Sequence, residues 1–402
     1  MVVVCGTITV QLLYNDPLNQ GSLHNEESGV GVPIVKDDEN LFVEWATTWG
    51  GAKNEEGNAI TLDSQSNIYI AGNTMSFGNS KPAMNDICII KYNHTGVQLW
   101  NKTWGGEFGE RCYEMEIDSN DNVYVLGYTT SYGAGGSDAF LNKYNPSGNM
   151  EWTRTWGGAN NEIGYDLVID NDDSIYITGI TKSYGDLNGD IFLVKLSENG
   201  SILWSCTWGD DNISEYAYAI TLDDMCKNIF ITGYLYYIGW DQIDILLLKF
   251  NATGDHLWSV IFGQNHQEAA NDIVLDSANN IYIAGYIRNV EIFDSDILLI
   301  KFNSLGEFQW SRTWHRGDID QAKAVILDSS QNILLVGQSN SDGVIVKFDS
   351  HGKLQNTHIF HEDIYSSLNN IAFNSVDRLL IVGNTKIGIN KGDISLITAH
   401  FK

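Results

Sequence analysis

Three observations in the 402-residue sequence predict an all-β fold, a seven-bladed β-propeller of four-stranded blades. A Trp-rich phrase returns with a period just above fifty residues, each period holds four short apolar runs, and the chain ends carry complementary parts of one period. Four-stranded units that recur roughly every 40 to 50 residues are typical of propellers. The composition agrees, because Gly is abundant at 39 and Pro is rare at 4.

The repeated phrase reads "EWTRTWGGANNE" at 151–162 and decays to "QWSRTWHRGDID" at 309–320. It contains two aromatic positions four residues apart, which lie on one face of a strand because side chains alternate. We therefore predict that these residues pack against the neighbouring blade. The positions are Trp45, Trp100, Trp152, Trp204, Trp258, Trp310 and Gln355, followed by Trp49, Trp104, Trp156, Trp208, Phe262, Trp314 and Phe360.

Turn residues divide each unit into four strands. In the third unit a strand ends at Asp170, a second covers 175–179, a third begins at Asp190, and the Trp-bearing strand follows Gly200. The Asp-rich turns "DSNDN" and "DNDDS" lack the spacing of an EF-hand loop, so we predict hairpin turns there rather than calcium loops.

The two ends predict a closed ring. Residues 41–49 resemble a fourth strand with no blade before them, and 393–401 resemble a third strand with no fourth after them. Pairing the two completes the last blade and leaves no open edge. We expect 41–402 to form one propeller and 1–40 to be an N-terminal extension, the remnant of a signal or a linker.

The elements "WGG", a following Glu, "ID", "IYI.G.T", "D.F..K" and "G...W" resemble the SBBP-type β-propeller repeat of secreted or surface proteins of archaea and bacteria. The resemblance covers residue 41 to the C-terminus, and units six and seven have lost the paired glycines. It implies a rigid platform, often a module of surface proteins, whose function resides in loops. It brings no catalytic motif with it.

The net charge and the cysteine content limit the classes of partner and site that we expect. The formal charge of -28 disfavours nucleic acid and anionic membrane, and it is compatible with cations or a neutral sugar. The five cysteines form no CxxC pair, so neither a zinc site nor a disulfide framework is indicated. No stretch is long enough to span a membrane. We expect a monomer that binds carbohydrate or protein without a cofactor.

The N-terminal segment bears on location. "MVVVCGTITVQLLY" is an apolar run without the basic start of a secretory signal. The Asn-x-Ser/Thr sequons are compatible with glycosylation outside the cell, so an extracellular or cell-surface location is favoured and a cytoplasmic one is the alternative. The sequons begin at Asn93, Asn101, Asn199, Asn212 and Asn251.

Repeated acids form a candidate metal site. One acid precedes the inner strand in six of the seven units, with Ser366 in the last, and together these acids could ring the channel mouth and hold calcium. The alternative, that each acid bonds turn amides in its own blade, is favoured because the acid recurs in nearly every blade. The candidates are Glu55, Glu110, Glu162, Glu215, Glu268 and Asp320; a second set opens the third strands, at Asp86, Asp138, Asp190, Asp244, Asp296, Asp342 and Asp393.

Aromatic residues in the loops between second and third strands form the candidate ligand site. They are Tyr234, Tyr236, Tyr237 and Trp240 in the fourth unit, with Phe77, Tyr132 and Tyr184 in corresponding loops. Planar rings beside acids and amides suit stacking on sugars or gripping a peptide, although such rings can also simply bury their loop.

Histidines offer a weaker metal hypothesis. They gather after the Trp strands of units five to seven, near acids such as Asp320, but without HxH or HExxH spacing. They are His266, His315, His358 and His361. No GxSxG, P-loop or GxGxxG motif is present. The sequence therefore favours a non-catalytic scaffold that recognises carbohydrate or protein; the alternative is a propeller hydrolase or lyase that acts on carbohydrate through two acids.

Overall fold

The computed structural model describes residues 2–4, 10–12 and 41–401, except for 82–83, 241, 264–265, 292, 362–366, 375–376 and 387–391. These residues form strands, turns and loops. None of the described segments is a helix with the length and hydropathy needed to cross a membrane.

Each blade contains four strands. Blade 1 has β4 (Glu55–Leu62), β5 (Ile68–Thr74), β6 (Asp86–Tyr92) and β7 (Gln98–Trp104). Blade 2 has β8 (Glu110–Ile117), β9 (Val123–Thr129), β10 (Asp138–Tyr144) and β11 (Met150–Trp156). Blade 3 has β12 (Glu162–Ile169), β13 (Ile175–Thr181), β14 (Asp190–Leu196) and β15 (Ile202–Trp208). Blade 4 has β16 (Ile213–Leu222), β17 (Asn228–Tyr237), β18 (Gln242–Asn251) and β19 (His256–Phe262).

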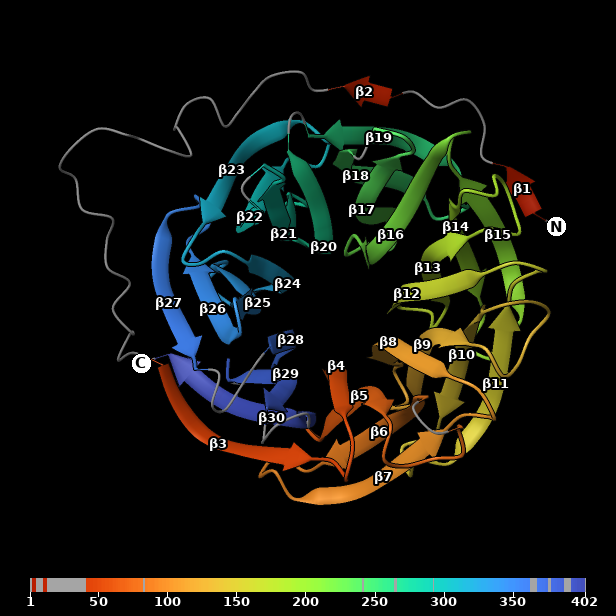
Figure 1. Cartoon of the computed structure of the whole chain (residues 1–402), viewed down its shortest axis with the longest axis vertical. Helices are drawn as coiled ribbons and strands as arrows, with labels where there is room; N and C mark the ends of the chain where they lie inside the picture. Colours follow the sequence, from red (N-terminus) through yellow and green to blue (C-terminus); the bar gives the residue numbers. More distant parts are fainter. Residues whose placement is uncertain are drawn as a thin grey trace.

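The remaining blades follow the same plan. Blade 5 has β20 (Gln267–Leu275), β21 (Ile281–Asn289), β22 (Asp294–Phe302) and β23 (Phe308–Trp314). Blade 6 has β24 (Asp320–Leu327), β25 (Ile333–Ser339), β26 (Asp342–Phe348) and β27 (Leu354–Phe360). Blade 7 has β28 (Ser367–Phe373), β29 (Leu379–Lys386), β30 (Gly392–Phe401) and β3 (Leu41–Trp49). In each blade the strands are antiparallel neighbours, and the first strand lies nearest the axis (Figure 1).

The two ends of the chain share blade 7. Strand β3 pairs with β30 from Leu41 opposite Phe401 to Trp49 opposite Ile394. The seven-bladed, all-β prediction and the predicted ring closure are thereby confirmed. Two short strands from residues 1–40 add to outer edges: β1 (Val2–Val4) pairs in parallel with β15, and β2 (Val10–Leu12) with β19 (Figure 1).

The hydrophobic core lies between blades. The ring of Trp104 in β7 lies 4.8 Å from Phe140 of the next blade, and that of Trp156 lies 4.4 Å from Phe192. Cys112, another buried residue, joins the first of these clusters as a free thiol. The repeated aromatics pack on the neighbouring blade, as predicted, because a four-stranded sheet cannot cover its own apolar faces.

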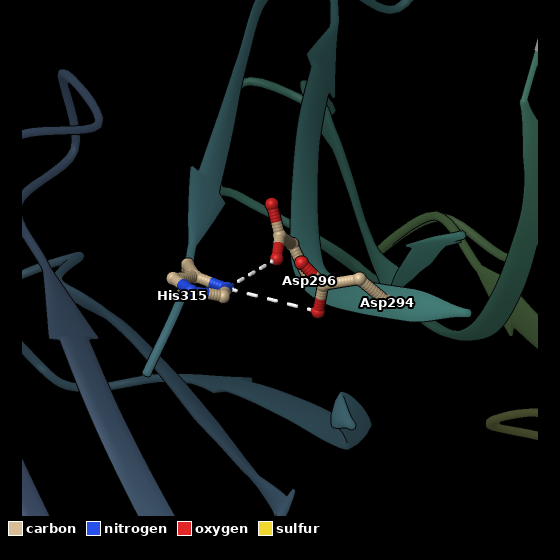
Figure 2. Close-up of side chains that lie close together, drawn as sticks. All are labelled: Asp294, Asp296 and His315. Atoms are coloured by element: carbon tan, nitrogen blue, oxygen red, sulfur yellow. Dashed lines mark hydrogen bonds and ion pairs between the residues drawn. The ribbon is translucent and has the colours of Figure 1, made fainter. Parts of the chain in front are cut away.

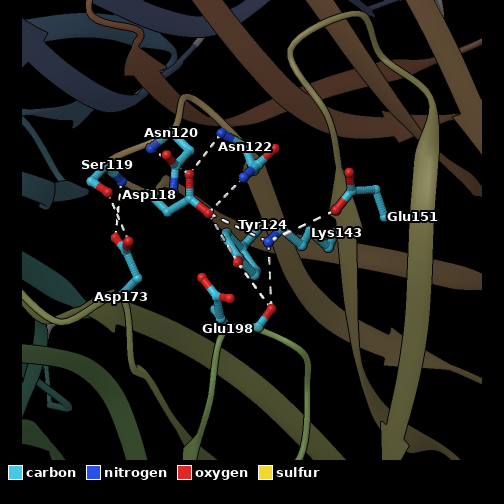
Figure 3. A network of polar contacts seen from close by, with 9 residues as sticks. All are labelled: Asp118, Ser119, Asn120, Asn122, Tyr124, Lys143, Glu151, Asp173 and Glu198. Carbon is cyan, nitrogen blue, oxygen red and sulfur yellow. Dashed lines mark hydrogen bonds and ion pairs between the residues drawn. The ribbon is translucent and has the colours of Figure 1, made fainter.

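Asp-rich turns between the first and second strands link neighbouring blades (Figure 3). Asp118 accepts hydrogen bonds from Asn122 N–H at 2.8 Å and from the Tyr124 hydroxyl at 3.1 Å, which closes the hairpin turn. In the next residue, Ser119 donates from N–H and Oγ to Asp173 of blade 3 at 2.9 and 2.7 Å. These turns therefore have the predicted hairpin role, and they also link neighbouring blades.

Candidate ligand-binding face and central channel

The paired glycines of the phrase lie where two blades meet. A Cβ built on Gly105 would lie 2.0 Å from Asp86 Oδ1 and 2.6 Å from Glu110 Oε2. At Gly105 the chain thus passes between the carboxylate of Asp86 in blade 1 and that of Glu110 in blade 2. A Cβ on Gly157 would meet Asp138 and Glu162 in the same way. At Gly105 and Gly157, an added side chain would have to displace a buried acid.

The predicted ring of acids is buried at these junctions. Glu162 accepts hydrogen bonds from Gly158 N–H at 2.6 Å, Ser183 N–H at 2.9 Å and the Thr181 hydroxyl at 3.0 Å. Gly158 belongs to the Trp phrase that leads into blade 3. Thr181 ends β13 of blade 3, and Ser183 follows in the next loop. The six candidates are at most 2% exposed: Glu55, Glu110, Glu162, Glu215, Glu268 and Asp320. The calcium hypothesis stays a prediction, and the saturated bonding of Glu162 weakens it.

Adding calcium should therefore raise the melting temperature only slightly, because a carboxylate whose lone pairs already accept several protein donors has little left for a cation. The measurement is a thermal melt with and without calcium, for the wild type and Glu162→Gln. The variant should lose about 1–3 kcal/mol of stability, since its amide would face N–H donors. A large, saturable calcium shift that disappears in Glu162→Gln would show that the acids bind metal.

At the junction between blades 3 and 4, hydrogen bonds only partly offset the burial of the Asp190 and Glu215 carboxylates. Burial raises the pKa of Glu215 to about 8, and the negative charge of Asp190 adds to this effect. Burial likewise raises the pKa of Asp190 to about 6. Because the folded-state pKa values are raised, protonation favours the folded state, and this contribution is lost as the pH rises through these values.

A histidine replaces the first glycine at the junction between blades 5 and 6. His315 Nδ1 lies 2.8 Å from Asp296 Oδ1 and 4.0 Å from Asp294 Oδ1 (Figure 2). Burial opposes the charging of this imidazole, but the hydrogen bond to Asp296 and the surrounding acids outweigh it and raise the pKa of His315. These three residues have the ligand types and spacing for a metal ion, and a protonated imidazole would be an ion-pair partner instead.

Of the other candidate histidines, His361 also lies near an acid. His361 Nδ1 lies 3.7 Å from Asp342 Oδ2. Among the described residues, only His315 of the four candidate histidines belongs to a cluster able to hold a metal ion. Glu362 and Asp363, which neighbour His361 in the sequence, lie outside the described residues.

Three of the predicted loop aromatics cover the phrase tryptophans. Phe77, Tyr132 and Tyr184 lie with their ring centroids 5.0, 5.4 and 5.1 Å from those of the tryptophans at positions 49, 104 and 156. The Tyr184 hydroxyl also donates to the Gly157 carbonyl at 3.0 Å. These rings thus support blade packing; whether they also contact a ligand stays a prediction.

The fourth-unit loop closes a hairpin with longer strands. Strands β17 and β18 have 10 residues each, whereas β13 and β14 of blade 3 have 7. Trp240 at the hairpin tip is 82% exposed, while Tyr236 and Tyr237 are half-buried. Blade 5 has a similar hairpin, on which Phe293 is 71% exposed. The hairpin patch is defined here as Ile238, Trp240, Val290 and Phe293, all exposed.

Inner strands supply a second set of functional candidates. Each inner strand has a β-bulge at the same place in its pairing with the second strand, and the bulged residue lines a central channel cavity of about 720 Å³. A bulge leaves one residue out of the ladder and redirects its side chain. The bulged residues are Asn58, Tyr113, Tyr165, Tyr218, Asn271, Lys323 and Asn369.

The three asparagines in this set link blades. Asn58 Nδ2 donates to the Cys112 carbonyl of blade 2 at 2.8 Å. Asn271 donates to the Ala322 carbonyl at 2.6 Å, and Asn369 to the Gly57 carbonyl at 2.7 Å. Asparagine at the bulge is therefore a structural clamp between adjacent inner strands.

Tyrosine replaces this clamp in blades 2, 3 and 4. The ring centroids of Tyr113 and Tyr165 lie 5.0 Å apart, and those of Tyr165 and Tyr218 lie 4.6 Å apart. We call these three residues the tyrosine wall. Tyr234, which the sequence predicted as a ligand residue, extends the row at 5.5 Å from Tyr218. The wall itself was missed; its signal is the change from Asn to Tyr at one repeat position in three consecutive units.

Carboxylates accompany the wall in the channel. Burial raises the pKa of Glu116 and of Asp272 to about 7. Burial also raises the pKa of Asp166 well above its usual range, and the charge of Asp272 adds to the shift. Asp166 accepts a hydrogen bond from Ile220 N–H of blade 4 at 2.7 Å, so it also joins inner strands. Burial thus raises the pKa of all three channel acids, and Asp166 also has a structural role.

Comparisons with known proteins support the fold. No family model matches the chain. An uncharacterized WD repeat-containing protein, L264 of Acanthamoeba polyphaga mimivirus, is 23% identical over 359 residues, which cover 63% of this chain and 26% of the viral protein. This chain therefore spans about a quarter of the length of that curated relative.

Solved structures of other proteins also match this chain in fold. The Pan2 WD40 domain of Neurospora crassa matches with a TM-score of 0.58 and 9% identity, covering 92% of this chain and 98% of that domain. The polysaccharide lyase Uly1 matches with a TM-score of 0.55 and 11% identity, covering 88% and 92%. At such identities the likeness shows the fold alone. The chain accordingly has a WD40-like β-propeller repeat fold.

Proposed function

We propose that this chain is a non-catalytic binding module that recognises a protein through the hairpin patch. One observation carries the proposal: Trp240 is 82% exposed at the tip of a hairpin whose two strands have 10 residues each, against 7 in blades 1 to 3. A large exposed aromatic is typical of interaction surfaces, where such residues supply most of the binding energy.

Protein is favoured over carbohydrate by the composition of the patch. Ile238 and Val290 are exposed aliphatic side chains, which offer no planar face for a sugar ring. The exposed rings of Trp240 and Phe293 suit a segment with apolar side chains. The net charge of -28 favours a partner that is also basic, because complementary charge speeds and orients association.

The channel acids favour a second candidate, a carbohydrate hydrolase or lyase. Glu116 and Asp272 have a raised pKa of about 7, owing to burial, which suits a general acid or base at neutral pH. The fold that this chain shares with a polysaccharide lyase permits such chemistry without indicating it. Release of sugar fragments from a polysaccharide panel would support this candidate against a pure scaffold.

Location and family belong to the same proposal. The resemblance of "WGG" and "IYI.G.T" to SBBP-type repeats and the presence of sequons support an extracellular or cell-surface module. A monomeric state is part of the proposal. Calcium is not required for the proposed binding. These features go with a platform that presents one loop face to its partner.

Screening the purified chain against a display library of short peptides and a glycan array tests the proposal. We expect basic, apolar peptides to bind, and we expect Trp240→Ala with Phe293→Ala to weaken their Kd by about thirtyfold, as for a hot-spot pair. The free energy of unfolding should change by only about 0.5 kcal/mol, because both residues are exposed.

The matched control is Leu305→Ala. Leu305 is 69% exposed in a turn between β22 and β23, on the opposite face of blade 5, and its removal should leave peptide binding unchanged. Hits confined to glycans, or peptide affinities that survive the double substitution, would contradict recognition of protein through the hairpin patch.

A further inference from the structure

The tyrosine wall lines the central channel cavity. Tyr113, Tyr165 and Tyr218 lie on the inner strands β8, β12 and β16, which are neighbours around the channel (Figure 1). All three line the cavity of about 720 Å³ and are only half-buried. Their rings therefore offer accessible aromatic surface to a small molecule or to a single side chain inside the channel.

The fold does not need tyrosine at these positions. In blades 1, 5 and 7 the same bulge carries an asparagine that hydrogen-bonds to the next blade, as Asn58 does with Cys112. Tyrosine in three consecutive blades gives up that clamp three times. A repeat that departs from its own structural solution on one side of the channel indicates a local requirement other than blade packing.

Acidic groups outnumber basic groups in the cavity lining. The lining contains two cations, Arg111 and Lys323, of which Arg111 is already paired with Glu56 at 2.5 Å. The acids that line the same cavity are Glu56, Glu114, Glu116, Asp166 and Asp272. Lys323 lies on β24, across the channel from β12, whereas Glu114, Glu116 and Asp166 lie on the wall strands β8 and β12 (Figure 1).

We propose that the tyrosine wall and the neighbouring carboxylates form a site for an organic cation, a guanidinium or alkylammonium group. Aromatic faces attract such cations through their quadrupole, and the interaction strengthens where water is partly excluded. Carboxylates supply the opposite charge and accept the N–H groups. Lys323 repels the cation from the far side and thereby directs it to the wall. This site is separate from the hairpin patch and does not depend on it.

The proposal predicts a specific pH dependence. The acids Glu116 and Asp272 have pKa values raised by burial to about 7, so they lose negative charge as the pH falls through that value. Affinity for a cation should therefore weaken from about pH 8 to about pH 5.5. A neutral ligand such as a sugar would not respond in this way.

Calorimetric titration of the full chain with butylguanidinium tests the site. Its neutral isostere butylurea and glucose are the control ligands. Tyr165→Phe retains the aromatic face and should bind as the wild type does, whereas Tyr165→Leu should bind about tenfold more weakly, the size expected for a partly desolvated cation–π contact. Lys323→Met should bind more tightly, because it removes the opposing charge.

The possible outcomes separate this site from the hairpin patch. Trp240→Ala should leave butylguanidinium binding unchanged, even if it abolishes peptide binding. Equal binding of butylurea or glucose, weaker binding by Lys323→Met, or no binding at millimolar butylguanidinium would each overturn the proposal. A thermal melt of each variant ensures that folded proteins are compared, and Tyr165→Phe and Lys323→Met are chosen because they preserve side-chain volume.

Discussion

A chain truncated through Trp49 should fail to fold, whereas a chain truncated through residue 40 should remain folded. Strand β3 forms the outer edge of blade 7 and pairs with β30 along its whole length. Its Trp45 and Trp49 also pack on a cluster that includes Ile60 of blade 1. Deleting β3 therefore removes a strand pairing and an interface between blades, and it exposes a new sheet edge.

Far-UV circular dichroism and thermal melting compare the two truncations at the same protein concentration. Truncation at 40 also removes β1 and β2, which only add to outer edges, so a small loss of stability is expected there. A synthetic peptide of residues 41–49, added in trans, should partly restore the melting transition of the longer truncation. An unchanged melting temperature after truncation through Trp49 would show that β3 does not close the ring.

Gly105→Ala should be the most damaging methyl addition in its loop. The new Cβ would lie 2.0 Å from Asp86 Oδ1 and 2.6 Å from Glu110 Oε2. Neither carboxylate can withdraw at little cost, because Asp86 accepts N–H groups of Asn79 and Ser80 and Glu110 accepts the N–H of Gly106 at 3.0 Å. We expect a loss of about 1–3 kcal/mol, typical of overpacking in a buried site.

Gly109→Ala is the matched control for this prediction. It lies in the same loop, and its added Cβ would meet no atom closer than 3.9 Å, so its stability should change little. Denaturant unfolding of both variants gives the comparison. Combining Gly105→Ala with Asp86→Ala should cost less than the sum of the single changes, because the second removes one clashing group. Equal stabilities of Gly105→Ala and Gly109→Ala would contradict the junction geometry.

The sequence predicted part of the candidate site. The acids of the Trp phrase were identified as a repeated set, and the preference for bonding within each blade is consistent with the contacts of Glu162. Trp240 stood out as the tryptophan outside the repeat, and it is the most exposed of the large hydrophobic residues described. Here the departure from the repeat coincides with an exposed side chain, whereas the repeated aromatics pack between blades.

Other features depend on three-dimensional contacts. The sequence placed Tyr236 and Tyr237 together with Trp240 in one contact loop, but strand pairing extends through Tyr237, and the two tyrosines are half-buried. The bulge that turns Tyr113, Tyr165 and Tyr218 into the channel is set by register with the second strand, which no local pattern reveals.

The sequence by itself determined the number of blades, the strand order and the closure of the ring, because a period of four strands with paired aromatics has one compact solution in which every blade covers its neighbour. Only the tertiary structure decided which side chains of the inner strands share the channel and which acids meet across a junction. Residues such as Asp86 and Glu110, or Tyr113 and Tyr165, come from different blades, and their distances depend on how neighbouring blades pack rather than on local sequence.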